Sequence, residues 1–77
     1  MKILITGAAG QIGSGLSRLL IENGHDLTLV DNLRNGYLEN LKDDANEVIA
    51  PFYEVDITSK DFFTECGGDY DVIIHLA

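Results

Sequence analysis

The 77-residue sequence has one cysteine, one proline, two histidines and no tryptophan, and these shortages exclude several classes of protein. Cys66 alone cannot form an internal disulfide bond, which fits a reducing compartment. Together with His25 and His75 it does not make up the ligand set of a closed zinc site, so we expect no bound metal. No apolar run approaches the roughly 20 residues that span a bilayer, and the apolar start ends at Thr6, too early for a signal peptide. We therefore expect a cytoplasmic protein without a membrane partner.

Basic residues are also scarce. Five Lys and Arg stand against 13 Asp and Glu, which gives a formal net charge of −8. Proteins that bind nucleic acid gather Lys and Arg on one face, and anionic membranes attract basic segments, so we expect neither partner. The 45% hydrophobic and 23% charged content is typical of a globular chain rather than a disordered one, and the length allows one small domain at most.

The most informative feature that is present is a glycine-rich turn, Gly7-Ala8-Ala9-Gly10-Gln11-Ile12-Gly13, directly behind the apolar run Ile3–Thr6. A pyrophosphate is bound best by free N–H groups at the first turn of a helix, which the main chain must bring close to it. Gly7 would let the chain turn off the strand, Gly10 would remove a Cβ that faces the phosphates, and Gly13 would let the helix pack against the strand. The spacing alone also suits a flexible loop, so the context matters.

The context is an acidic residue about 20 positions further on, which binds the adenosine ribose hydroxyls. Asp31 stands there, after the apolar stretch 27–30, although a solvated acid at a strand end is the alternative interpretation. An amphipathic helix is predicted over residues 11–23, and Gly24 is expected to end it. The side that faces the core is expected to carry four residues at the spacing i, i+4, i+7, i+8, namely Ile12, Leu16, Leu19 and Leu20. The sequence therefore predicts a strand–helix–strand nucleotide-binding unit.

Strand and helix patterns alternate along the whole chain. Strands are predicted at Lys2–Thr6, Asp26–Val30, within Val48–Val55 and at Asp71–Ala77. Pro51 belongs at the start or on the outer edge of the third strand, because it cannot donate a ladder hydrogen bond. A short helix at Leu38–Leu41 is weakly marked, and Thr58 with Asp61 predicts the cap of a helix at Ser59–Cys66. This predicts an α/β fold: a partial Rossmann, doubly wound parallel sheet with flanking helices, four strands in the order 3-2-1-4, and the ligand at their carboxyl ends.

Four motifs in this order resemble the extended short-chain dehydrogenase/reductase family, and within it the branch of NAD-dependent nucleotide-sugar epimerases and dehydratases. They are Thr6–Gly13, Asp31–Gly36, the pair Asp56-Ile57, and His75-Leu76-Ala77. The resemblance covers the whole chain but only the first third or so of such an enzyme. Gln11 departs from it, because epimerases usually carry an aromatic residue there, and this weakens the assignment to the epimerase itself.

The resemblance implies a cofactor role for each matching residue. Gln11 and Ile12 would cover the pyrophosphate, and Asp31 would bind the ribose. The adenosine end would be lined by Asn32, Leu33, Asn35 and Gly36, the adenine would be contacted by Asp56 and Ile57, and the nicotinamide half would lie over Leu76 and Ala77. Two alternatives stay open: Asp56 as part of a helix-capping turn before Thr58, and Asn35-Gly36 as a tight turn only. NAD is favoured over NADP, because Asp31 would repel a 2′-phosphate, although Arg34 nearby would attract one.

The family's catalytic Tyr-x-x-x-Lys pair is missing from this sequence. Tyr37, Tyr53 and Tyr70 are not followed by lysine four positions later, so we expect no catalytic residue and no activity in the chain by itself. We expect residues 1–77 to be the amino-terminal part of an NAD(P)-binding Rossmann domain, a fragment without its substrate domain. Val72–Ile74 at an unpaired edge predict a marginal fold in isolation.

Three functions are compatible with these residues. The favoured one is the NAD-binding part of a nucleotide-sugar epimerase or dehydratase, which transfers a hydride transiently between sugar and NAD and is a homodimer at full length, as the resemblance implies. The alternatives are a stand-alone, non-catalytic dinucleotide-binding module and a fragment of another short-chain dehydrogenase/reductase with a non-sugar substrate; an inert remnant is also compatible. The sequence leaves the substrate open.

Overall fold

The computed structural model describes residues 1–58 and 67–76, and strand and helix alternate through residue 54 as the sequence predicts. The predicted helix Ser59–Cys66 and the last residue, Ala77, lie outside the described residues. In chain order the elements are β1 (Lys2–Thr6), α1 (Gln11–Glu22), β2 (Asp26–Asp31), the short 3-10 helix η1 (Leu38–Leu41), β3 (Phe52–Glu54) and β4 (Val72–His75). The third and fourth strands are shorter than the predicted windows, and the second extends by one residue to Asp31.

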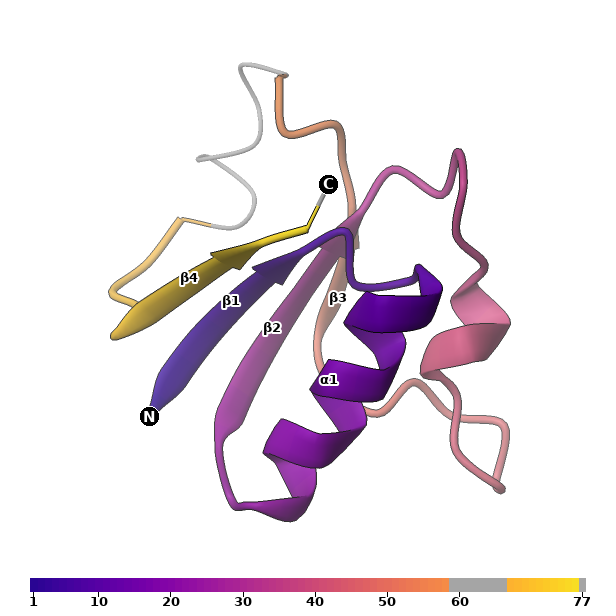
Figure 1. The fold of residues 1–77 in the computed structure, drawn as a ribbon, viewed down its shortest axis with the longest axis horizontal. Coiled ribbons are helices and arrows are strands. Elements are labelled where there is room, and N and C mark those ends of the chain that lie inside the picture. Colours follow the sequence, from indigo (N-terminus) through magenta and orange to yellow (C-terminus); the bar gives the residue numbers. More distant parts are fainter. Residues whose placement is uncertain (59–66, 77) are drawn as a thin grey trace.

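The four strands form one sheet in the order β3-β2-β1-β4, and all neighbouring pairs are parallel (Figure 1). This confirms the predicted 3-2-1-4 order. Pro51 directly precedes the edge strand β3, and its carbonyl accepts the Leu29 N–H at 2.8 Å. The proline therefore takes part in the sheet only as an acceptor, as expected for a residue without an N–H.

The core lies on both faces of the central strands. Ile5 and Leu29 are fully buried on the face that α1 covers, whereas Leu4 and Val30 are buried on the opposite face. Strand β1 is buried from its second residue to its last. Its continuous apolar run therefore has the predicted cause: both faces of the strand are covered.

The predicted core-facing side of α1 is only partly right, because Leu20 packs against the core but Ile12 and Leu19 do not. Ile12 is 77% exposed and Leu19 is 54% exposed, and the buried helix residues are instead Gly13, Ser14 and Ser17. Leu20 and Ile21 complete this side by packing partly buried against the core. The physical reason is the short distance between helix and turn, which admits small side chains and leaves the larger apolar ones outside.

Candidate nucleotide-binding site

The site lies at the carboxyl ends of the strands, where the segments that follow β1, β2 and β3 come together (Figure 1). A cavity of about 220 Å³ opens between them. It is smaller than the roughly 300–1,000 Å³ of typical ligand pockets, so it can hold only part of a dinucleotide. Its lining residues are Gly7, Gly10, Asp31, Asn32, Asn35, Gly36, Val55, Ile57 and Leu76.

The turn after β1 presents the start of α1 to this cavity. Gly7 has a φ of +74°, which lets the chain leave the strand sharply, and the Ala8 N–H is held by the Val30 carbonyl at 3.1 Å. Gly10 is the N-cap of α1 and supplies no side-chain acceptor, and the first turn of the helix contains no acidic residue. The helix therefore begins without a side-chain acceptor for its first N–H groups, which favours an anion at this end.

Gly10 and Gly13 serve this turn in different ways. Gly10 lines the cavity, and a Cβ added there would meet only one heavy atom within 4 Å, the Gly7 carbonyl oxygen at 3.6 Å. A Cβ added at Gly13 would instead lie 2.3 Å from the Gly7 oxygen and 2.9 Å from the Ala8 Cα. The first glycine keeps room for a ligand, and the second keeps the helix close to the turn.

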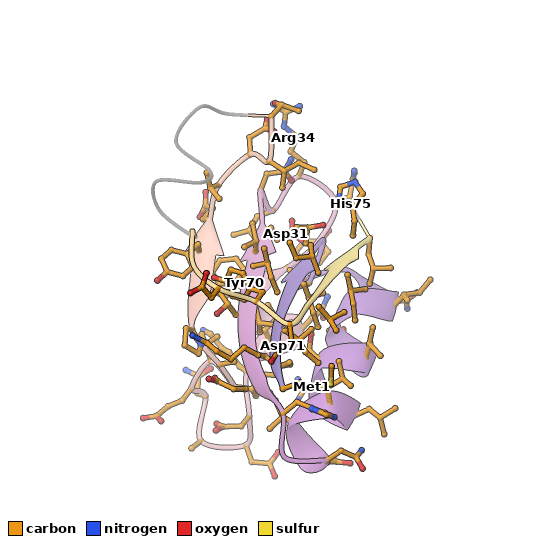
Figure 2. All side chains as sticks on the ribbon, turned by 90° about the vertical axis from the view of Figure 1, so that its left-hand side faces the viewer. Met1, Asp31, Arg34, Tyr70, Asp71 and His75 are labelled. Carbon is orange, nitrogen blue, oxygen red and sulfur yellow. The ribbon has the colours of Figure 1, made fainter. Side chains whose placement is uncertain are left out.

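Asp31, the last residue of β2, places a carboxylate beside the turn. Its Oδ2 accepts the Ala9 N–H at 2.9 Å and its Oδ1 accepts the Leu33 N–H at 2.7 Å, and the residue is 9% exposed. Each carboxylate oxygen keeps a further lone pair, and Asp31 lines the cavity, so these oxygens can accept hydroxyl groups of a ligand. The carboxylate is thus built into the site and is not the solvated strand-end acid of the alternative interpretation. Figure 2 shows it at the same end of the molecule as Arg34 and His75.

The loop after β2 packs directly on the turn. Gly36 is buried, and a Cβ there would lie 2.7 Å from both the carbonyl carbon and the oxygen of Ala9. The Tyr37 N–H and the Asn40 side-chain amide both donate to that oxygen, at 3.2 and 2.8 Å. Asn35-Gly36 is therefore more than a tight turn, because this pair lines the cavity and Gly36 allows a close backbone contact.

Asp56, beyond β3, forms a local turn with Thr58. Its Oδ1 accepts both the Thr58 N–H, at 2.9 Å, and the Thr58 hydroxyl, at 2.7 Å. The hydrogen bond from the Thr58 N–H first, and then the one from the Thr58 hydroxyl, hold the pKa of Asp56 below its ordinary value. Desolvation opposes them, and the positive charge of Arg34 adds the smallest lowering effect. This hydrogen-bonded turn matches the alternative interpretation of Asp56, while its neighbour Ile57 lines the cavity.

Most of the predicted site residues meet at the cavity. Of the predicted set, those that line it are Gly7, Gly10, Asp31, Asn32, Asn35, Gly36, Ile57 and Leu76. Gln11 and Ile12 are exposed at the start of α1, and Gly13 is buried in the first turn of the same helix. Leu33, with a φ of +59°, donates its N–H to the Asp31 carboxylate. Ala77 lies outside the described residues. Cofactor contact by these residues stays a prediction.

Sequence reasoning missed three features of the site. Val55 lines the cavity and was seen only as part of a strand, and Asn40 reaches the turn from a distance of 31 residues in the sequence. His75 shares a 2.7 Å hydrogen bond with the Thr6 hydroxyl across the ends of β4 and β1. The contact between His75 and Thr6 could have been found by predicting the register of β4 on β1. No local sequence pattern marks the contact of Asn40 with the turn.

Residues 1–58 and 67–76 contain no group of three or more His, Cys, Asp or Glu side chains placed to hold a metal ion. Within the same residues, every helix is too short or too polar to span a lipid bilayer.

A parallel sheet of this order, with a glycine turn, a helix start and a strand-end carboxylate around one cavity, defines the Rossmann class of α/β proteins. The model of the family described as "NAD dependent epimerase/dehydratase family" matches residues 3–77. The chain belongs to this family, which confirms the family resemblance seen in the sequence.

Individual relatives agree with this assignment. A UDP-glucose 4-epimerase of Corynebacterium glutamicum is 34% identical over 77 residues, which is 100% of this chain and 22% of the relative. A UDP-N-acetyl-alpha-D-glucosaminuronate decarboxylase of Bacillus cytotoxicus is 36% identical and is matched by 99% of this chain over 23% of its own length. The crystal structure of Thermus thermophilus UDP-glucose 4-epimerase in complex with NAD is 32% identical, with a TM-score of 0.79 over 100% of this chain and 24% of that one. The chain therefore spans about a quarter or less of the length of these proteins.

Proposed function

We propose that this chain binds NAD and forms the cofactor-binding part of an enzyme that acts on nucleotide sugars. The observation that carries the proposal is the Asp31 carboxylate, which the Ala9 N–H holds 2.9 Å away beside the uncapped start of α1. A ribose acceptor and an anion position then share one cavity, which is the combination that an adenosine diphosphate needs. The T. thermophilus relative, whose structure contains NAD, supports this choice of ligand.

The features of the cavity fit the cofactor. Gly10 leaves space that a side chain would fill, and the start of α1 offers N–H groups to the pyrophosphate. Asp31 would accept the ribose hydroxyls, and Ile57 with Val55 would provide an apolar wall for the adenine. When bound, NAD supplies a hydride acceptor; the residues of this chain bind and orient it.

A carboxylate at the ribose also selects between the two nicotinamide dinucleotides. NADP carries an extra 2′-phosphate, which Asp31 would repel in a poorly solvated position. Arg34 is exposed on the same loop, but its positive charge acts on Asp56. We therefore propose a preference for NAD of at least about tenfold, equivalent to about 1.4 kcal/mol.

Calorimetric titration with NAD and NADP tests the proposal. Asp31→Asn keeps the size of the side chain but removes its charge, so we expect weaker NAD binding and a smaller preference for NAD over NADP. Asp44→Asn on an exposed loop is the matched control and should leave both affinities unchanged. Absence of NAD binding, or tighter binding of NADP, would refute the proposal.

For the whole protein we also propose a nucleotide-sugar substrate, a homodimer and a cytoplasmic location. The relatives' names support the substrate class, since an epimerase and a decarboxylase both act on UDP-linked sugars. The family resemblance supports the dimer, and the single cysteine supports a reducing compartment. Binding of UDP-glucose and the mass of the protein in solution test the first two.

A further inference from the structure

The backbone of Ala9 connects two parts of the proposed cofactor site through two successive peptide groups. Ala9 is fully buried in the turn, and its N–H donates to the Asp31 carboxylate at 2.9 Å. Its carbonyl oxygen accepts the Tyr37 N–H at 3.2 Å and the Asn40 side-chain amide at 2.8 Å. The N–H belongs to the Ala8–Ala9 peptide and the oxygen to the Ala9–Gly10 peptide, and the two meet at the Ala9 Cα. The loop after β2 therefore holds the Ala9 backbone on one side, and on the other side Ala9 holds Asp31 together with the Leu33 N–H.

Asn40 is itself held in place from α1. One terminal nitrogen of the Arg18 guanidinium donates to the carbonyl oxygens of Asn40, at 2.6 Å, and Lys42, at 2.9 Å. These carbonyls lie at the carboxyl end of η1, where a positive charge is favourable. Contacts thus run from Arg18 through Asn40 and Ala9 to the Asp31 carboxylate.

We propose that Asn40, anchored by Arg18, is a positioning residue that sets the Asp31 carboxylate for the ribose hydroxyls of the dinucleotide. This inference rests on the proposed function. Asn40 does not line the cavity, so it acts on the ligand only through the Ala9 backbone. Without the Asn40 amide donor the Ala9 carbonyl keeps only its longer hydrogen bond, from the Tyr37 N–H. The Ala9 backbone is then held less firmly, and its N–H fixes Asp31 Oδ2 less well.

The test compares two probes that differ by a single hydroxyl group, ADP and 2′-deoxy-ADP, by calorimetric titration of the protein. A charge-assisted hydrogen bond from the 2′-hydroxyl to Asp31 gives the wild type about a tenfold preference for ADP. Asn40→Asp has the same shape but no amide donor, and we expect its preference to fall to about twofold or less. The added negative charge weakens the binding of ADP and of 2′-deoxy-ADP alike, so its effect cancels in the ratio of the two affinities.

Two further variants separate positioning from general effects. Asn46→Asp adds the same charge on an exposed loop and should keep the tenfold ratio. Arg18→Met removes the guanidinium donors from η1 and should lower the ratio while Asn40 stays intact. If Asn40 had a purely structural role, its loss would weaken the binding of ADP and of 2′-deoxy-ADP equally. An unchanged ratio of the two affinities in Asn40→Asp therefore overturns the inference.

A ligand-free measurement keeps this inference distinguishable from the proposed function. Amide hydrogen exchange at Ala9 should be about tenfold faster in Asn40→Asp, whereas exchange at Leu29, in the buried centre of β2, should not change. A wild type that binds ADP and 2′-deoxy-ADP equally would contradict the proposed role of Asp31. Unchanged exchange at Ala9 would overturn the positioning role of Asn40 whatever the ligand data show.

Discussion

Gly13 is the residue at which one added methyl group tests the architecture of the site most directly. A Cβ there would lie 2.3 Å from the Gly7 oxygen, 2.9 Å from the Ala8 Cα and 3.1 Å from the Ala8 carbonyl carbon. All three neighbours are backbone atoms, so no side chain can rotate away, and α1 would have to move off the turn. Such overpacking costs about 1–3 kcal/mol, and Ala in place of Gly returns up to about 1 kcal/mol of helix propensity.

The same helix contains its own control. Gly15 has no heavy atom within 4 Å of an added Cβ, so Gly15→Ala should stabilise the protein by about 0.5–1 kcal/mol. Gly13→Ala should destabilise it by about 1–2 kcal/mol, which places the two variants about 1.5–3 kcal/mol apart. Urea unfolding followed by circular dichroism measures both free energies.

The expected binding result follows from the same displacement. In Gly13→Ala the first turn of α1 moves away from the cavity, so this variant should bind NAD about tenfold more weakly than the wild type. Gly15→Ala should bind NAD as the wild type does. If Gly13→Ala gained stability as Gly15→Ala does, α1 would not approach the turn as closely as the structure shows. The reasoning about the glycine spacing would then be refuted.

The remaining predictions concern the cavity and Asp56. Gly10→Ala should weaken NAD binding about tenfold, because the added Cβ would take up space at the lining of the cavity. The free energy of unfolding should stay within about 0.5 kcal/mol of the wild-type value, because the Cβ clashes with no neighbour. An unchanged affinity for NAD would contradict this prediction. Thr58→Val should raise the pKa of Asp56 in a carboxyl NMR titration, whereas Thr58→Ser keeps the hydroxyl and should not; equal values in all three proteins would rule out the hydroxyl contribution. Because folding lowers the pKa of Asp56, its contribution to stability is present above the ordinary aspartate pKa and is lost as the pH falls through the folded value.

The sheet and the site were predictable from the sequence to different extents. The strand order followed from alternating patterns and the place of Pro51, because local apolar runs and connection rules determine both. Asp31 was predictable because its distance from the glycine turn is set by one helix and one strand. These features depend on spacing along the chain, which a single sequence contains.

Features that depend on close packing were only partly predictable: the role of Gly13 was expected, but the rest was not. The rotation of α1 was missed because an apolar pattern counts Ile12 and Leu19 and gives no weight to Gly13 or Ser17, which pack most closely. The bond from Asn40 to Ala9 was missed because the two residues are 31 positions apart and no local pattern links them. The bond from Asn40 to Ala9 cannot be found before the course of the loop between β2 and η1 is known.

The Ala9 backbone, held at both its N–H and its carbonyl, also limits how such a site can change. Because the segment 31–40 contacts the phosphate turn through both of these groups, a change in the length of this segment would displace the turn as well as Asp31. A redesign of cofactor preference that exchanges only the acidic strand end would leave a loop that no longer fits the turn. Transplanting residues 6–13 together with 31–40 as one cassette keeps these contacts intact.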